Sequence, residues 1–165
     1  MHRMDADALR AVFVLRELSD EDLREFASLL ELREAHERER IIEEGTEVRA
    51  FYIVYDGVVH VRRLAQKREI LLGRIGAGGF FGEINLFDPG VATASIYAMK
   101  NAKLAQITYE RFRAFMKERP AAGYAITSAM VTEMARRLRQ TGSRLVNLVY
   151  WSSAQATEPR RPEPI

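Results

Sequence analysis

The chain has 165 residues, of which 47% are hydrophobic and 29% charged, with a net charge of +2 and no cysteine. This length suits one domain that buries its own core, and the lack of cysteine excludes disulfides, thiolate nucleophiles and cysteine-ligated zinc or iron–sulfur clusters. The net charge is too small to indicate a nucleic-acid-binding protein. Residues 1–10 lack the apolar stretch of a secretory signal, and no apolar run reaches about 18 residues, the length that spans a membrane. We therefore expect a cytoplasmic protein with no membrane span.

The N-terminal part predicts two short helices. Residues 7–17 carry apolar side chains at roughly helical spacing. A second helix is expected to begin at Ser19, because its hydroxyl can accept a hydrogen bond from a free N–H of the first turn. Asp22, three residues later, adds an acid at the positive end of the helix. Apolar residues between Leu23 and Leu30 make this second helix amphipathic.

Short segments rich in β-forming residues occupy the middle of the chain. Residues 51–55 end at Asp56-Gly57, a strong hairpin signal, so residues 58–61 are expected to pair back on them. Further strands are predicted at 69–72, 95–99 and 103–107, and a glycine-rich segment runs from Gly73 to Gly82. Short strands at this density predict an antiparallel barrel or roll.

Helical periodicity returns after Thr108, which can cap a helix that ends near Pro120. A long helix is then predicted from about Ala121 to about Trp151. Its apolar positions recur at alternating spacings of three and four, which forms a heptad-like seam suited to a second helix. The seam contains Val131, Met134, Leu138, Thr141, Leu145 and Leu148. The same stripe could pack on the roll of its own chain, but the helix is long relative to one small roll. The seam therefore favours a homodimer, with parallel and antiparallel pairing both open.

The C-terminal region is basic but short. Between Ala121 and Trp151 the single acid Glu133 accompanies four arginines, which is typical of a solvated helix face. Residues 152–165 contain three prolines and little apolar content, so they are expected to form a disordered tail. The 14 residues after Trp151 are too few for a helix-turn-helix with its supporting helices, so DNA is not an expected partner.

The segment Gly78–Phe87 resembles the phosphate-binding cassette of cyclic-nucleotide-binding domains, the family that includes the sensor domain of the bacterial cAMP receptor protein. Other segments resemble further parts of this domain in the right order, and together they cover residues 15–151. They are the opening helix at Leu18–Leu23, a turn at Glu43–Gly45, a strand at Tyr52–Gly57, the entry to the helix after the roll at Ile107–Phe112, and the long dimer helix at Glu133–Leu138.

The resemblance implies an α+β, mainly β fold, and the short stretch after Trp151 leads us to expect the sensor domain without a DNA-binding domain. This fold is an antiparallel β-roll with N-terminal helices and a long C-terminal helix. The implied domain spans residues 1–151, with the roll at about 33–107 and the C-terminal helices at about 109–151.

The resemblance also implies a ligand site. Its residues would be Gly82, Glu83, Ile84, Ala92, Thr93 and Thr141. In the family, the glycine lets the backbone come close to the cyclic phosphate, and the glutamate accepts a hydrogen bond from the ribose 2′-hydroxyl. Thr141 matches the first of two hydroxyl residues with which the dimer helix contacts the base, and Gly142 replaces the second.

One position departs from the family pattern. Ala92 stands where the family has an arginine that binds the phosphate, whereas Thr93 and Ala94 match the next two positions. A charge-assisted hydrogen bond contributes about 1.5–3 kcal/mol, so its loss should weaken a nucleotide roughly ten- to a hundredfold or more. The site could still hold cAMP or cGMP through backbone amides, Thr93 and a cation such as Arg74, or it could hold an uncharged ligand or none. Glu83 could bind a ribose or only cap local amides.

These features predict a non-enzymatic regulatory module that senses cAMP or cGMP and relays its ligand state through a dimerising helix. The alternative is a ligand-free dimerisation or docking scaffold, with a protein partner that the sequence does not name. A haem sensor is disfavoured, because His36 and His60 are the only internal histidines and His60 lies in an alternating apolar strand. No metal site is expected, and the sequence has no zinc-type histidine spacing, serine elbow or Walker loop.

Overall fold

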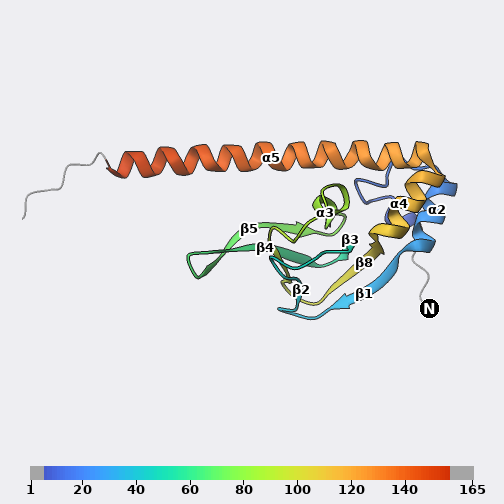
Figure 1. The fold of residues 1–165 in the computed structure, drawn as a ribbon, viewed down its shortest axis with the longest axis horizontal. Coiled ribbons are helices and arrows are strands. Elements are labelled where there is room, and N and C mark those ends of the chain that lie inside the picture. The colour runs from blue at the N-terminus through green and yellow to red at the C-terminus, as the bar shows by residue number, and fades with distance from the viewer. Residues whose placement is uncertain (1–5, 157–165) are drawn as a thin grey trace, which may run out of the picture. The chain divides into compact units, whose positions relative to one another are not determined.

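The computed structural model describes residues 6–156. They form two units, one ending at Ala129 and the other beginning at Met130, within the last helix. Figure 1 follows the elements along the chain. In order they are α1 (Ala6–Leu9), α2 (Asp20–Leu29), β1 (Glu31–Ala35), β2 (Arg40–Ile42), β3 (Ala50–Asp56), β4 (Val58–Ala65), β5 (Arg68–Gly76), β6 (Phe80–Phe81), α3 (Glu83–Phe87), β7 (Ser95–Ala98), β8 (Ala102–Thr108), α4 (Tyr109–Glu118) and α5 (Pro120–Ala156).

The strands of the first unit form two four-stranded sheets. The first sheet has the order β1-β8-β3-β6 and the second sheet the order β2-β7-β4-β5. Every strand pair in both sheets is antiparallel. The predicted antiparallel β-roll with N-terminal helices and a long C-terminal helix is therefore confirmed.

The hairpin predicted at Asp56-Gly57 is wrong. β3 belongs to the first sheet and β4 to the second, so the two strands do not pair with each other. Gly57 alone separates them, which leaves no room for the two-residue loop of a tight hairpin. Its φ is +92°, and a Cβ there would lie 2.9 Å from the Cβ of Ala102. Gly57 therefore forms the sharp bend at which the chain passes from the first sheet to the second.

The N-terminal helix predicted at 7–17 is largely replaced by turns. Only α1 is helical, and the chain then continues through hydrogen bonds that join residues three apart, such as Val12 N to Leu9 O and Leu15 N to Val12 O. Apolar side chains spaced by three are buried along this segment, namely Leu9, Val12, Leu15 and Leu18. Ser19 caps α2 as predicted, accepting from the Asp22 amide at 3.1 Å.

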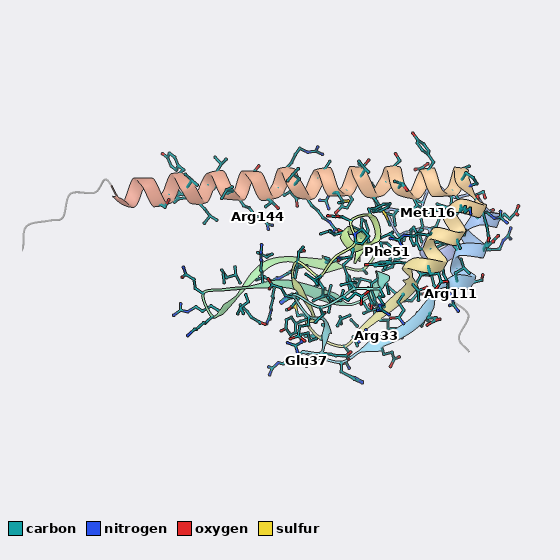
Figure 2. All side chains as sticks on the ribbon, in the orientation of Figure 1. Arg33, Glu37, Phe51, Arg111, Met116 and Arg144 are labelled. Atoms are coloured by element: carbon teal, nitrogen blue, oxygen red, sulfur yellow. The ribbon has the colours of Figure 1, made fainter. Side chains whose placement is uncertain are left out.

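Aromatic side chains join the helices to the first sheet. Phe51 of β3 lies in the interior of the first unit (Figure 2), with its ring 5.2 Å from that of Phe112 and 5.6 Å from that of Phe80. Phe26 of α2 makes edge contacts with Phe112 and Phe115 of α4. Edge-to-face aromatic pairs of this kind add to the hydrophobic gain of burial. This cluster fixes α4 against the sheet that leads into the cassette.

The last helix, α5, confirms the predicted long helix. Pro120 stands at its first position, where a missing N–H costs nothing. The helix continues to Ala156, beyond the predicted end at Trp151, and residues 157–165 of the predicted tail lie outside the described residues. Across residues 6–156, no helix has the length and apolar character needed to cross a membrane.

Candidate ligand-binding site

The candidate site begins at Gly82, between β6 and α3. Gly82 has a left-handed backbone, with φ of +84°. A Cβ at this position would lie 2.6 Å from the carbonyl oxygen of Ala50, well inside contact distance. Glycine is therefore required both by its conformation and by the close approach of β3. The sequence named Gly82 for its approach to a ligand, which stays a prediction, and gave no sign of the Ala50 carbonyl that also excludes a side chain here.

Two side chains of α4 hold α3 at its two ends. The Tyr109 hydroxyl donates to the Gly82 carbonyl at 2.6 Å, and Arg113 Nη2 donates to the Leu86 carbonyl at 2.6 Å. Carbonyls near the end of a helix carry partial negative charge, so an arginine is a favourable partner there. Neither residue was predicted as part of the site. Arg113 lies outside every segment that resembles the family. Tyr109 lies within one, Ile107–Phe112, but that resemblance assigns no role to it.

Within α3, the side chains divide between the interior and the surface. Glu83 and Asn85 are buried, and Asn85 Nδ2 donates to the Val91 carbonyl at 3.2 Å, which ties the helix to the loop that follows. Ile84 and Phe87 are 41% and 48% exposed, and Val91 is 57% exposed. The cassette thus presents apolar side chains to solvent while its polar side chains face inward.

The segment after α3 docks on the turn before β3. The Ala92 amide donates to Thr46 O and the Ala92 carbonyl accepts from Gly45 N, both at 2.8 Å. The hydroxyl oxygen of Ser95 accepts from the Glu44 amide at 2.9 Å. Ala92 is buried, whereas Thr93 is exposed. The backbone groups of Ala92 are therefore engaged within the protein, and the Thr93 side chain is open to solvent.

Arg74, named from the sequence as a substitute cation, belongs to β5 and lies directly opposite His60 of β4. In the part of the chain that the structure describes, no hydrogen bond or ion pair joins it to residues 82–95. Arg113 does contact the cassette, through its bond to the Leu86 carbonyl. The sequence could not predict the contact between Arg113 and α3, because Arg113 lies 27 residues after Leu86 and only the fold brings them together.

Thr141 and the seam lie on the part of α5 that belongs to the second unit. The Thr141 hydroxyl donates to the Arg137 carbonyl at 2.9 Å, one turn earlier. The apolar seam residues are exposed, from 36% at Met134 to 74% at Leu138, and include Val131, Leu145 and Leu148. Glu133 pairs with Arg136 and Arg137 on the same helix, and these bonds lower the pKa of Glu133. Within the described part of the second unit, the apolar side chains of the seam are therefore not buried.

The two histidines weighed as haem ligands differ in their exposure. His36 is exposed and His60 is buried in β4. Among residues 6–156, no group of three or more histidine, aspartate or glutamate side chains is placed to hold a metal ion.

Comparisons with known proteins agree with this architecture. Residues 32–119 match the family model described as "Cyclic nucleotide-binding domain". The chain is 31% identical over 111 residues to the "CRP-like cAMP-activated global transcriptional regulator" of Mycobacterium tuberculosis, an alignment that covers 67% of this chain and 48% of that protein. It is 27% identical over 134 residues to the "cAMP-activated global transcriptional regulator CRP" of Salmonella typhimurium, covering 80% of this chain and 62% of the relative. The chain thus spans between about half and three fifths of the length of these curated relatives.

Solved structures show the same fold. A cyclic nucleotide-binding domain from Methylobacillus flagellatus superimposes with a TM-score of 0.78 at 18% identity, covering 86% of this chain and 84% of that one. The Thermus thermophilus Catabolite Activator Protein superimposes with a TM-score of 0.72 at 26% identity, covering 83% and 63%. The family match extends over more than half of the sequence and includes the whole cassette. This chain therefore belongs to the cyclic nucleotide-binding domain family.

Proposed function

We propose that this chain is a regulatory domain that binds cAMP or cGMP at the cassette around α3 and catalyses no reaction. The observation that supports the proposal is the set of contacts that hold the cassette: a Cβ at Gly82 would lie 2.6 Å from the Ala50 carbonyl, and α4 bonds to both ends of α3 through Tyr109 and Arg113. A binding site gains affinity when its groups are held in place before the ligand arrives. The cAMP that activates the named relatives is the ligand class that this frame would take.

The missing arginine sets the expected affinity. With Ala92 at the arginine position, the cyclic phosphate would lack a bidentate cation and would depend on neutral donors such as the Thr93 hydroxyl. Glu83, buried next to Gly82, would accept from the ribose hydroxyl. We expect an affinity roughly ten- to a hundredfold weaker than in a site that keeps the arginine.

The signal would pass from the cassette to the C-terminal helices. A ligand that contacts α3 in one conformation more strongly than in another shifts the population toward that conformation. The bonds from Tyr109 and Arg113 would carry such a shift of α3 into α4, which precedes α5. The exposed seam of α5 would then pair with the same seam of a second copy, forming a homodimer whose geometry reports the ligand state.

A second function, that of a ligand-free dimerisation or docking scaffold, is favoured by one observation. Both backbone groups of Ala92 already bond to the turn at Gly45 and Thr46, so this position offers a phosphate neither a cation nor a free amide. Such a scaffold would keep the fold and the seam while its cassette stays empty.

Calorimetric titration with cAMP, cGMP and the non-cyclic 5′-AMP separates the two functions. Saturable binding of a cyclic nucleotide, absent with 5′-AMP, supports the sensor. Glu83→Gln should then weaken binding about tenfold, the equivalent of one charge-assisted hydrogen bond, while the exposed control Glu47→Gln should not. No heat and no thermal shift at millimolar nucleotide would overturn the sensor and support the scaffold.

A further inference from the structure

A row of polar side chains crosses the second sheet away from the cassette. Arg40 of β2 lies opposite Tyr97 of β7, Tyr97 opposite His60 of β4, and His60 opposite Arg74 of β5. Directly opposed residues of antiparallel strands point to the same face of the sheet. Val59, next to His60 on β4, is fully buried and points to the other face. The row therefore lies on the opposite face of the second sheet from the buried Val59 side chain.

Arg62 and Tyr97 of this face hold a single carboxylate. The Arg62 guanidinium lies over the Tyr97 ring, 5.2 Å from its centroid. Arg62 Nη1 donates to one oxygen of Glu69 at 3.2 Å, and the Tyr97 hydroxyl donates to the other at 2.7 Å. These bonds lower the pKa of Glu69, with the tyrosine contributing most. Both oxygens of Glu69 are therefore engaged, and Glu69 remains ionised.

The three arginines on this face are not fully compensated by acids. Arg40 pairs with Glu43 at 3.0 Å and Arg62 with Glu69. Arg74 forms no hydrogen bond or ion pair with any residue within 6–156. The face therefore carries a surplus positive charge at Arg74, beside His60.

His60 supplies a buried donor that lacks an acceptor. Its side chain is only 7% exposed, and Arg62 Nη2 lies 3.4 Å from its Nδ1. A guanidinium can only donate, so Nδ1 is the acceptor and the neutral ring carries its proton on Nε2. Burial, followed by the charges of Arg62 and Arg74, lowers the pKa of His60, which agrees with a neutral ring. In the described structure, Nε2 is buried without a hydrogen-bond partner.

We propose that this face of the second sheet carries an oxyanion site, in which His60 Nε2–H and the guanidinium groups of Arg62 and Arg74 bind a phosphate or carboxylate group. An oxyanion supplies the acceptor that Nε2–H lacks, and its charge offsets the uncompensated arginine. A cation is disfavoured, because Arg74 has no acid partner among residues 6–156 and would repel it, while both oxygens of Glu69 are already engaged. Long arginine side chains can turn their planar groups toward an oxyanion without movement of the strands. The site uses no residue of the cassette, so it stands or falls independently of cyclic nucleotide binding.

The test follows the ring nitrogens of His60 by NMR in the full chain. Inorganic phosphate is titrated at constant ionic strength against chloride, near pH 7.5, with the exposed His36 as an internal reference. We expect a saturable shift of the His60 signals, with little change at His36. Acetate is titrated in parallel: a response to both anions assigns the site to carboxylates as well, and a response to phosphate alone assigns it to phosphate groups.

Arg74→Gln provides the decisive variant, because Arg74 is exposed and its loss should leave the fold intact. We expect it to weaken phosphate binding about tenfold, the equivalent of one charge-assisted hydrogen bond. Arg38→Gln removes an arginine of the same sheet region whose side chain is 90% exposed, and should have no effect. The proposal is overturned if His60 shows no saturable shift up to tens of millimolar phosphate, or if Arg74→Gln and the parent chain respond equally.

Discussion

The Tyr109 hydroxyl donates a hydrogen bond to the Gly82 carbonyl at 2.6 Å. Tyr109 is the first residue of α4, and Gly82 immediately precedes α3, so this bond ties the start of one helix to the start of the other. Burial raises the pKa of Tyr109, with smaller contributions from Tyr52 and Glu83. The phenol therefore stays protonated and remains a donor at neutral pH. α4 thus sets the position at which the cassette begins.

Replacing Tyr109 with phenylalanine should loosen the cassette without disturbing the core. The change removes one donor, and a buried hydrogen bond contributes about 0.5–1.5 kcal/mol. We expect the free energy of unfolding in urea to fall by about 1 kcal/mol, and amide exchange within Glu83–Phe87 to become faster. Tyr124→Phe is the matched control, since Tyr124 is 77% exposed. Equal losses in the two variants, or unchanged exchange in α3, would contradict the role assigned to Tyr109.

Substitution of Gly82 tests the close approach of β3. Gly82→Ala would place a Cβ 2.6 Å from the Ala50 carbonyl in a left-handed backbone, so we expect a loss of roughly 1–3 kcal/mol in unfolding free energy. Gly73→Ala is the control, because a Cβ there meets nothing within 4 Å and the backbone is not left-handed. Chemical denaturation of both variants gives the comparison. A Gly82→Ala protein as stable as Gly73→Ala would show that the backbone at Gly82 can relax.

The sequence predicts local features well where the physical cause is local. Ser19 caps α2 and Pro120 opens α5, because each acts on its own helix end. The strand at Glu31–Ala35 escaped prediction, since its glutamate, leucine and alanine favour helices and only pairing with β8 makes it a strand. The Asp56-Gly57 turn was misread for the same reason: its signal is local, but the sheet that each strand joins is decided elsewhere.

In the candidate site, too, the residues of a local motif could be named from the sequence, whereas the residues that reach it from elsewhere in the chain could not. Gly82 and Glu83 lie in a contiguous motif, so resemblance alone names them as candidate ligand residues, a role that stays a prediction. Tyr109 and Arg113 act on carbonyls 27 residues earlier in the chain. A backbone carbonyl has no signature in the sequence, and therefore no pattern could have joined either side chain to the cassette.

The seam of α5 predicts a concentration-dependent dimer. Leu138 is 74% exposed, and a charge placed at such a position would have to be buried against the partner helix at considerable cost. We expect Leu138→Glu to weaken self-association at least tenfold in sedimentation equilibrium. Gln140→Glu, an exposed off-seam change on the same helix, is the control. If the parent chain is monomeric at all accessible concentrations, or if the two variants behave alike, the seam is not a dimer interface.

The depressed pKa of His60 predicts a loss of stability in mild acid. At a pH below about 6.5 the unfolded chain takes up a proton at His60 that the folded protein resists, so the free energy of unfolding should fall as the pH drops from about 6.5 toward the folded pKa. Glutamates with lowered pKa values, such as Glu39, lose their contribution only near and below their ordinary value of 4.5. Denaturation midpoints between about pH 5 and 7 therefore isolate the histidine. His60→Gln should flatten the profile and the exposed control His36→Gln should not; a parent profile that is already flat would contradict the prediction.

Restoring the arginine tests whether the cassette keeps a working shape. Ala92→Arg would add the guanidinium that the family pattern places there, and one such charge-assisted bond to the cyclic phosphate contributes about 1.5–3 kcal/mol. We therefore expect calorimetry to show a gain in cAMP affinity of roughly ten- to a hundredfold. Val91→Arg adds the same charge at the neighbouring exposed residue and controls for general attraction. Because Ala92 is buried, a denaturation curve must first show that the variant is folded. An equal gain in both variants would assign the effect to net charge. No gain in a folded Ala92→Arg protein would mean that the segment bonded to Gly45 and Thr46 does not present this position to a nucleotide.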